Sequence, residues 1–422
     1  MFCFVTYIGA NIGLALQNNY AALLVLRCLQ SAGSSGTVAL AKAVVSDIVT
    51  SAERGTYMGY ASMGALVGPA FGPVIGGLLS QYLGWRFIFW FLAIFAGIAL
   101  ILILTILPET CRRIVGNGSL PAQKWNVSLL TCVRQRRQRK SSMNGQMETR
   151  NSFKKRPNPL NTIYIIMDKE SGIVLLYAAI LFSGFYMVIT SLPSQLQSKY
   201  GFNELQIGLC YLPTGFGAMA AAFCVGRFLN WNFARHAKIH GLAITKGRQQ
   251  DLKNFPIEVA RLQVVLPLVF CACVTVVTYG WVLTAHMNLA GPLILLFVST
   301  FCMSGSFQGL STLVVDLNRD SPGTATAAMN MARCWLGAGA VAIVQPMLKA
   351  IGLGWVTVFV AGVWILMSPV VLIVMRRGPR WRTEKMERNA KKENMKEAAR
   401  IGDTGLEEGR KEQGEVVRDQ DR

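Results

Sequence analysis

Long apolar runs alternate along this chain with short polar connections and with two longer basic ones. A stretch of about 20 apolar residues can cross the hydrocarbon core of a bilayer as a helix. We count about ten such stretches and expect each to form a transmembrane helix. The pattern therefore predicts an all-α polytopic membrane protein. The expected spans are 1–17, 20–46, 56–80, 85–107, 172–193, 204–226, 262–284, 289–315, 324–349 and 353–375.

The composition agrees with a protein that lies in a lipid bilayer. Hydrophobic residues make up 52% of the chain and charged residues only 15%, whereas soluble proteins carry about 25% charged residues. The net charge is +20, which in a soluble protein would suggest a nucleic-acid partner. Here the cations stand between the apolar runs, so we interpret them as topology signals and expect no nucleic-acid partner.

The basic connections divide the chain into four parts. We expect a partial N-terminal helical half over 1–108, a basic central loop over 109–171, a six-helix half over 172–376 and a charged tail over 377–422. Because basic loops stay on the cytoplasmic side, we expect both termini in the cytoplasm. The alternating charges of the tail fit either a solvated helix or a disordered segment. We further expect a monomer in the plasma membrane, with the vacuolar membrane as the alternative.

Small residues recur at helical spacing in the third apolar stretch. Glycines four residues apart share one face of a helix, and such a face lets a second helix approach closely in lipid. Prolines in the same stretch each remove a backbone hydrogen bond and bend the helix. We interpret the stretch as a specialised, kinked helix, and a generic packing seam is the alternative. Its residues are Gly64, Gly68, Pro69, Gly72, Pro73, Gly76 and Gly77.

This stretch resembles the G-x-x-x-G-P-x-x-G-G signature of proton-driven antiporters in the major facilitator superfamily. Further motifs fit the same family, among them Arg27-Cys-Leu-Gln30 before Gly33, Gly84-Trp85-Arg86 and Leu107-Pro108-Glu109-Thr110. Together they resemble the fungal twelve-spanning drug:proton antiporters, in particular the quinidine-resistance and dityrosine-exporter branch. The matching motifs are those of family helices three to twelve, so the resemblance implies a four-plus-six arrangement that lacks the first two helices.

The resemblance also implies a function. Members of this family are secondary transporters that export drugs or small organic molecules in exchange for protons by alternating access. We therefore expect a small amphipathic organic substrate and protons as partners, and no cofactor. The alternative is an inactive or regulatory, truncated transporter-like membrane protein, because the chain lacks the first two helices of the family.

Five ionisable residues and two amides are candidates for a cavity charge or a gate. Arg27, with Gln30 beside it, either snorkels to the outer surface or stands as a cation in the cavity. In the family this arginine is thought to set the protonation of a nearby carboxylate. Arg333 shares a helix face with Asn330, and it either lines the cavity or pairs near the inner surface. The remaining candidates lie toward the cytoplasmic side: Lys42, Asp47 and Asp316.

The C-terminal half supplies aromatic and polar groups suited to an amphipathic substrate. We name Tyr186, Tyr211, Phe307 and Gln308 as substrate-lining candidates, with ordinary helix packing as the alternative for each. We find no carboxylate near the middle of the ten spans. The proton-carrying group is therefore expected in the two family helices that this sequence lacks, or at a shallower residue such as Asp47.

The sequence argues against an enzyme. The chain has three histidines, His236, His240 and His286, and none stands in a metal-binding motif. No nucleophile elbow occurs, and no G-x-x-x-x-G-K-[ST] phosphate loop is present. We accordingly expect no catalytic residues, no metal site and no ATP-driven pump.

Overall fold

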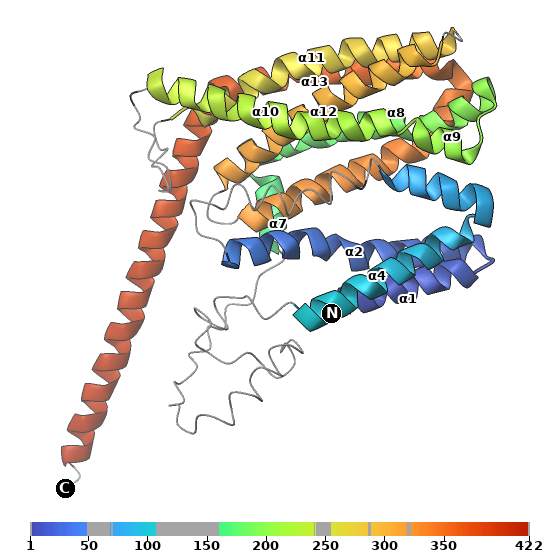
Figure 1. Cartoon of the computed structure of the whole chain (residues 1–422). Coiled ribbons are helices and arrows are strands. Elements are labelled where there is room, and N and C mark those ends of the chain that lie inside the picture. Colours follow the sequence, from blue (N-terminus) through green and yellow to red (C-terminus); the bar gives the residue numbers. More distant parts are fainter. Residues whose placement is uncertain are drawn as a thin grey trace, which may run out of the picture.

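The computed structural model describes residues 2–48, 68, 71–106, 160–239, 241, 255–285, 288–318 and 322–420. Every regular element among these residues is a helix, as the apolar runs predicted. Six of the described helices are long and apolar enough to cross a membrane. Figure 1 shows the helices gathered in an upper and a lower group, with one long helix that projects away from both.

The N-terminal group consists of three helices and the segment 71–83. Helix α1 (Phe2–Leu16) packs against α2 (Tyr20–Ile48) and against α4 (Arg86–Ile106). The small core between them contains Leu14, Ala15 and Phe89. Helices α1 and α2 approach closely at Gly33, where an added Cβ atom would lie 2.9 Å from the carbonyl oxygen of Cys3. A small residue at this position lets the two backbones come into contact.

The C-terminal group is a larger bundle with one continuous core. It contains α7 (Leu160–Met167), α8 (Lys169–Tyr200), α9 (Glu204–Leu209), α10 (Leu212–Ile239), α11 (Ile257–Thr284), α12 (Ala290–Leu317) and α13 (Pro322–Gln420). Helix α8 packs along α13, and α11 packs along both α12 and α13. Trp364 and Tyr279 are the largest fully buried side chains of this core.

Polar capping residues determine where the helices begin and end, which the pattern of apolar residues does not predict. Asp168 caps α8 by accepting a hydrogen bond from the backbone N–H of Ser171, and Gly201 ends the helix with φ of 64°. Asn203 and Gln206 form a capping box at the start of α9. Such caps satisfy backbone groups that a helix end leaves free. Helix α8 therefore extends beyond the expected span 172–193 at both ends.

Two expected boundaries need correction. Helix α10 continues to Ile239, well past the expected end at residue 226, because its last turns are polar but still helical. Helix α7 lies within the segment 109–171 that we expected to be a loop. Its side chains Ile165 and Ile166 pack against the C-terminal core, which stabilises this short helix.

Helix α13 holds the last two expected spans and most of the tail. It breaks at Gly352, whose φ of 76° and ψ of 165° are not helical, and this is the connection expected between residues 349 and 353. Beyond the second stretch the helix continues to Gln420. In Figure 1 this last part, drawn in red, leaves the bundle as a single straight helix. Of the two alternatives for the tail, the structure has the helix.

Candidate functional site

The glycine-rich segment 71–83 meets the C-terminal bundle through backbone contacts. A Cβ atom on Gly77 would lie 2.5 Å from the carbonyl oxygen of Glu204, and one on Gly208 would lie 2.5 Å from the carbonyl oxygen of Pro73. The Gln81 side chain also accepts a hydrogen bond of 3.2 Å from the backbone N–H of Glu204. Two glycines on two helices thus make one close crossing, which we call the Gly77–Gly208 crossing.

The observed close contact lies at Gly77 and not on the face shared by Gly68, Gly72 and Gly76. Among the described residues, no atom lies within 4 Å of a Cβ added to Gly68, Gly72 or Gly76, so the structure shows no close contact at these three positions and their packing role stays a prediction. The contact occurs at Gly77, which points in a different direction around the helix. Gly64 and Pro69 lie outside the described residues.

Arg27 and Gln30 form a polar cluster that joins α1 to α2. The Gln30 side chain donates a hydrogen bond of 2.7 Å to Asn11, and both residues are buried. Arg27 donates to the Gln30 side-chain oxygen at 3.1 Å. Its guanidinium carbon lies 4.7 Å from the centre of the Phe89 ring. No acidic side chain is paired with Arg27 among the described residues.

Arg333 stands in an aromatic cluster at the meeting of three helices. Its guanidinium carbon lies 4.8 Å from the ring centre of Phe182 on α8 and 5.5 Å from that of Phe307 on α12. Phe182 stacks in turn on Tyr186, with ring centres 4.2 Å apart. The Arg333 Nε atom is buried without a hydrogen-bond partner. We call these four residues the Arg333 cluster; it contains two of the predicted lining residues, Tyr186 and Phe307.

Two other lining candidates make packing contacts instead. The Tyr211 hydroxyl donates a hydrogen bond of 3.0 Å to the carbonyl oxygen of Ile189 and so ties α10 to α8. The Gln308 side-chain nitrogen lies 3.4 Å from the position of a Cβ on Gly226 of α10. Neither contact belongs to the Arg333 cluster, and both fit the packing alternative.

The side chains of some gate candidates belong to the described part of the structure and those of others do not. Lys42 and Asp47 lie on α2, but their side chains are outside the described part of the structure. Asp316 forms a salt bridge of 3.1 Å with Arg261, and Arg261 also donates to the carbonyl oxygen of Leu229. Asp316 therefore links α12 to α11 and α10 within one bundle. Asn330 is exposed on α13, one helical turn before Arg333.

One acidic site was missed by the sequence reasoning. Glu170 at the start of α8 and Glu258 at the start of α11 are 3% and 0% exposed. Arg382 of α13 contacts Glu258 at 3.0 Å and donates to the carbonyl oxygen of Phe255 at 2.7 Å. The Gly378 backbone packs against both carboxyl side chains. One guanidinium thus faces two buried carboxyls, and two ionised carboxylates so close together would repel each other.

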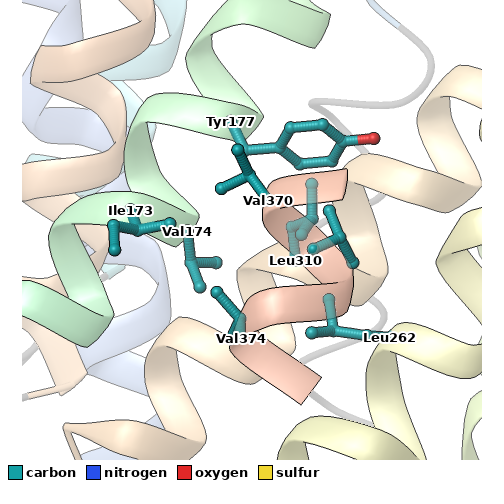
Figure 2. A pocket seen from close by; sticks show the side chains of 8 residues that line it. Ile173, Val174, Tyr177, Leu262, Leu310, Val370 and Val374 are labelled. Carbon is teal, nitrogen blue, oxygen red and sulfur yellow. The ribbon is translucent and has the colours of Figure 1, made fainter. Parts of the chain in front are cut away.

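A minor pocket lies within the apolar core of the C-terminal bundle. It lies between α8, α11, α12 and α13 and has a volume of about 10 Å³, enough for about one water molecule. Figure 2 shows Val174, Tyr177, Leu310 and Val374 around this space. All of its lining side chains except the Tyr177 hydroxyl are apolar, so we assign it to core packing. Within the described residues, no group of three or more His, Cys, Asp or Glu side chains is placed to hold a metal ion.

Comparison with known proteins defines the class of this chain. Residues 1–342 match the family described as Major Facilitator Superfamily. The solved structure of the human organic anion transporter MFSD10 (TETRAN) aligns with 88% of this chain and 75% of that one, with a TM-score of 0.51 and 17% sequence identity. This likeness concerns the fold alone. The chain belongs to the major facilitator superfamily, whose members are integral membrane transporters and not enzymes.

Curated fungal proteins show the same relationship at higher identity. The MFS-type transporter phiD of a fungal species is 44% identical over 94% of this chain and 60% of its own length. The MFS-type transporter clz19 of Cochliobolus lunatus is 45% identical over 90% of this chain and 71% of its own length. Citrate exporter 1 of Aspergillus niger is 36% identical over 93% and 75%. The chain thus spans between 60% and 75% of the length of these three relatives.

Proposed function

We propose that this protein is a secondary transporter that exports drugs or other small organic molecules across a membrane in exchange for protons. The observation that carries the proposal is the Gly77–Gly208 crossing, where the N-terminal segment 71–83 meets the C-terminal bundle through its backbone. Alternating access requires one group of helices to rock against the other around a fixed line of contact. The Gly77–Gly208 crossing supplies such a line of contact. Because no side chains interdigitate between two glycines, the two helix backbones can rotate against each other without any side chain having to repack.

The relatives support the transport of small organic solutes. One is named a citrate exporter and the others are named MFS-type transporters. We carry over to this chain only the general class, a small organic molecule moved across a membrane. The proton as coupling ion comes from the antiporter motif, and the cytoplasmic placement of both termini comes from the basic loops.

Reconstitution of the purified chain into liposomes tests the proposal. The vesicles hold a trapped pH-sensitive dye, and a panel of aromatic amines, aromatic carboxylates and citrate is added one solute at a time. We expect at least one solute to change the internal pH as it moves, and we expect a proton ionophore to abolish the gradient-driven part of its transport. Transport of no solute in the panel, by protein that is folded and inserted, would favour the inactive or regulatory alternative. Solute movement without proton movement would reject the antiport mechanism and leave a uniporter.

A further inference from the structure

The Arg333 cluster combines a cation with no counter-ion and an aromatic surface. No acidic side chain pairs with Arg333 among the described residues. Its Nε atom is buried and makes no hydrogen bond. The guanidinium faces the rings of Phe182 and Phe307. Each ring attracts the cation through its electron-rich face, but a ring carries no formal negative charge and so supplies less than a paired carboxylate that is shielded from water.

The position of the cluster is what a transport site requires. Arg333 lies about 16 Å along the axis from the start of α13 at Pro322, and Phe182 lies about 20 Å from the start of α8, at a rise of about 1.5 Å per residue. Counted instead from the expected span starts at residues 172 and 324, the depths are about 15 Å for Phe182 and about 14 Å for Arg333, near the middle of a hydrocarbon core of about 30 Å. An unpaired arginine at that depth is costly, and such residues mark substrate or ion pathways. Substrate sites of secondary transporters lie near the midplane.

One side of the cluster is open. Tyr186 is 42% exposed although it stacks on Phe182, and Asn330 is exposed one turn before Arg333. In the view of Figure 1 the first part of α13, drawn in orange, lies between the rest of the C-terminal group and α2. A ligand that reached Tyr186 would lie beside Phe182, whose ring contacts both Tyr186 and the Arg333 guanidinium.

We infer that the Arg333 cluster binds an organic anion that carries an aromatic ring, with its carboxylate on Arg333 and its ring against Tyr186 and Phe182. This inference rests on the proposed function and names the substrate class. The planar guanidinium suits a carboxylate, because it offers parallel N–H donors to both oxygens. The stacked pair Phe182–Tyr186 provides a flat apolar surface beside that charge.

The same charges select against cations. Arg27 on α2 also faces an aromatic ring, and no acidic side chain is paired with it among the described residues. A cationic drug that approached Arg333 would be repelled and would leave the guanidinium unpaired, and such unfavourable contacts are a source of specificity. The cluster therefore discriminates by charge as well as by shape.

Equilibrium binding of 2-naphthoate to the full chain in nanodiscs tests this inference. The neutral probe 2-naphthamide has the same ring and nearly the same shape, so the comparison isolates the carboxylate. We expect naphthoate to bind at least tenfold more tightly than naphthamide, and we expect Arg333→Gln to remove that preference. Tyr186→Leu should weaken both probes by a similar factor, because it removes the ring contact and leaves the charge. Tyr186 is partly exposed, so this variant also tests the site if Arg333→Gln does not fold.

Arg235→Gln is the matched control. Arg235 also lies over an aromatic ring, Trp231, at 5.8 Å, but on the exposed last part of α10, so the variant should bind both probes as the parent chain does. Equal affinity of the parent for the two probes, or full binding in both Arg333→Gln and Tyr186→Leu, would overturn the inference. Binding of naphthoate as expected by a chain that transports no solute would contradict the proposed function and leave this site in place.

Discussion

The carbonyl oxygen of Glu204 lies 2.5 Å from the place that a Cβ atom would occupy on Gly77. We predict that Gly77→Ala reduces transport strongly, because the added methyl group must push the two helix backbones apart. Overpacking of this kind costs about 1–3 kcal/mol, and about 1.4 kcal/mol corresponds to a tenfold change in rate. Initial rates of solute efflux from proteoliposomes measure the effect.

Gly72→Ala is the control for this prediction. Gly72 belongs to the same segment, but no atom lies within 4 Å of its added Cβ. It should retain most of the transport rate, with the protein inserted to the same level as the parent. Equal loss of transport in both variants would show that the glycine spacing matters for the helix itself and would reject the crossing as the pivot.

The buried carboxyls predict a pH-dependent stability. Among the described residues, Glu170 and Glu258 share one guanidinium, that of Arg382, and interact with each other, so we expect the folded protein to hold one proton on the pair at neutral pH. An unfolded glutamic acid loses its proton near pH 4.3. The folded state then binds more protons than the unfolded state above this pH, so the free energy of unfolding falls as the pH rises. Glu170→Gln should flatten this dependence, which thermal unfolding between pH 5 and 8 measures.

The neighbouring charges that act on Glu170 support the expected sign. Asp168 adds a further negative charge beside Glu170, and Arg261 is already paired with Asp316. Glu387→Gln, at an exposed position of α13, is the control and should keep the slope of the parent chain. The same slope in Glu170→Gln as in the parent would mean that the pair carries no proton.

The hydrogen bond between Gln30 and Asn11 should contribute measurably to the N-terminal group. It is short, at 2.7 Å, and both residues are buried. Hydrogen bonds between transmembrane helices contribute on average about 0.6 kcal/mol, and at most about 1.7 kcal/mol. We expect a coupling energy in this range from a double-mutant cycle with Gln30→Leu and Asn11→Leu, read as unfolding in mixed micelles. Purely additive effects would indicate that the two side chains do not interact in the membrane.

Asp316 can be tested as a structural residue against the gate role expected from the sequence. Its carboxylate contacts Arg261 at 3.1 Å, and the two side chains are only 21% and 10% exposed. Removal of the Asp316 charge leaves the buried Arg261 guanidinium without its counter-charge, so Asp316→Asn should lower the unfolding temperature. The double variant Asp316→Leu/Arg261→Met should recover much of the loss. Unchanged stability together with lost transport in Asp316→Asn would favour the gate.

The apolar runs were sufficient to predict the long membrane-spanning helices among the described residues, because in a bilayer an apolar stretch of spanning length forms a helix. The limits of α8 and α10 could not be obtained in this way. A helix can continue through polar residues such as Asn232 and His236, where hydropathy carries no signal. Caps such as Asp168 depend on the local backbone rather than on hydrophobicity.

The candidate site was predicted unevenly for a physical reason. Helical spacing identifies which glycines share a face, but the neighbour on that face is set by tertiary packing, so Gly77 and not Gly72 makes the contact. Arg333 and Phe307 were recognisable because a cation or an aromatic ring stands out in an apolar run. Glu170 and Glu258 lie 88 positions apart just before apolar stretches, and only the bundle brings them together with Arg382.

The last part of α13 continues as one helix beyond the bundle, so it can act as a lever that amplifies motions of the bundle. Arg382 is fastened to Glu258 and to the Phe255 backbone, and the helix continues from there to Gln420. The 38 residues between these positions span about 57 Å at a rise of about 1.5 Å per residue. A tilt of about 10° at Arg382 would therefore carry the far end through about 10 Å. Small displacements at the base of this helix are thus converted into motions large enough to be read at its tip, for example by the separation of two spectroscopic labels.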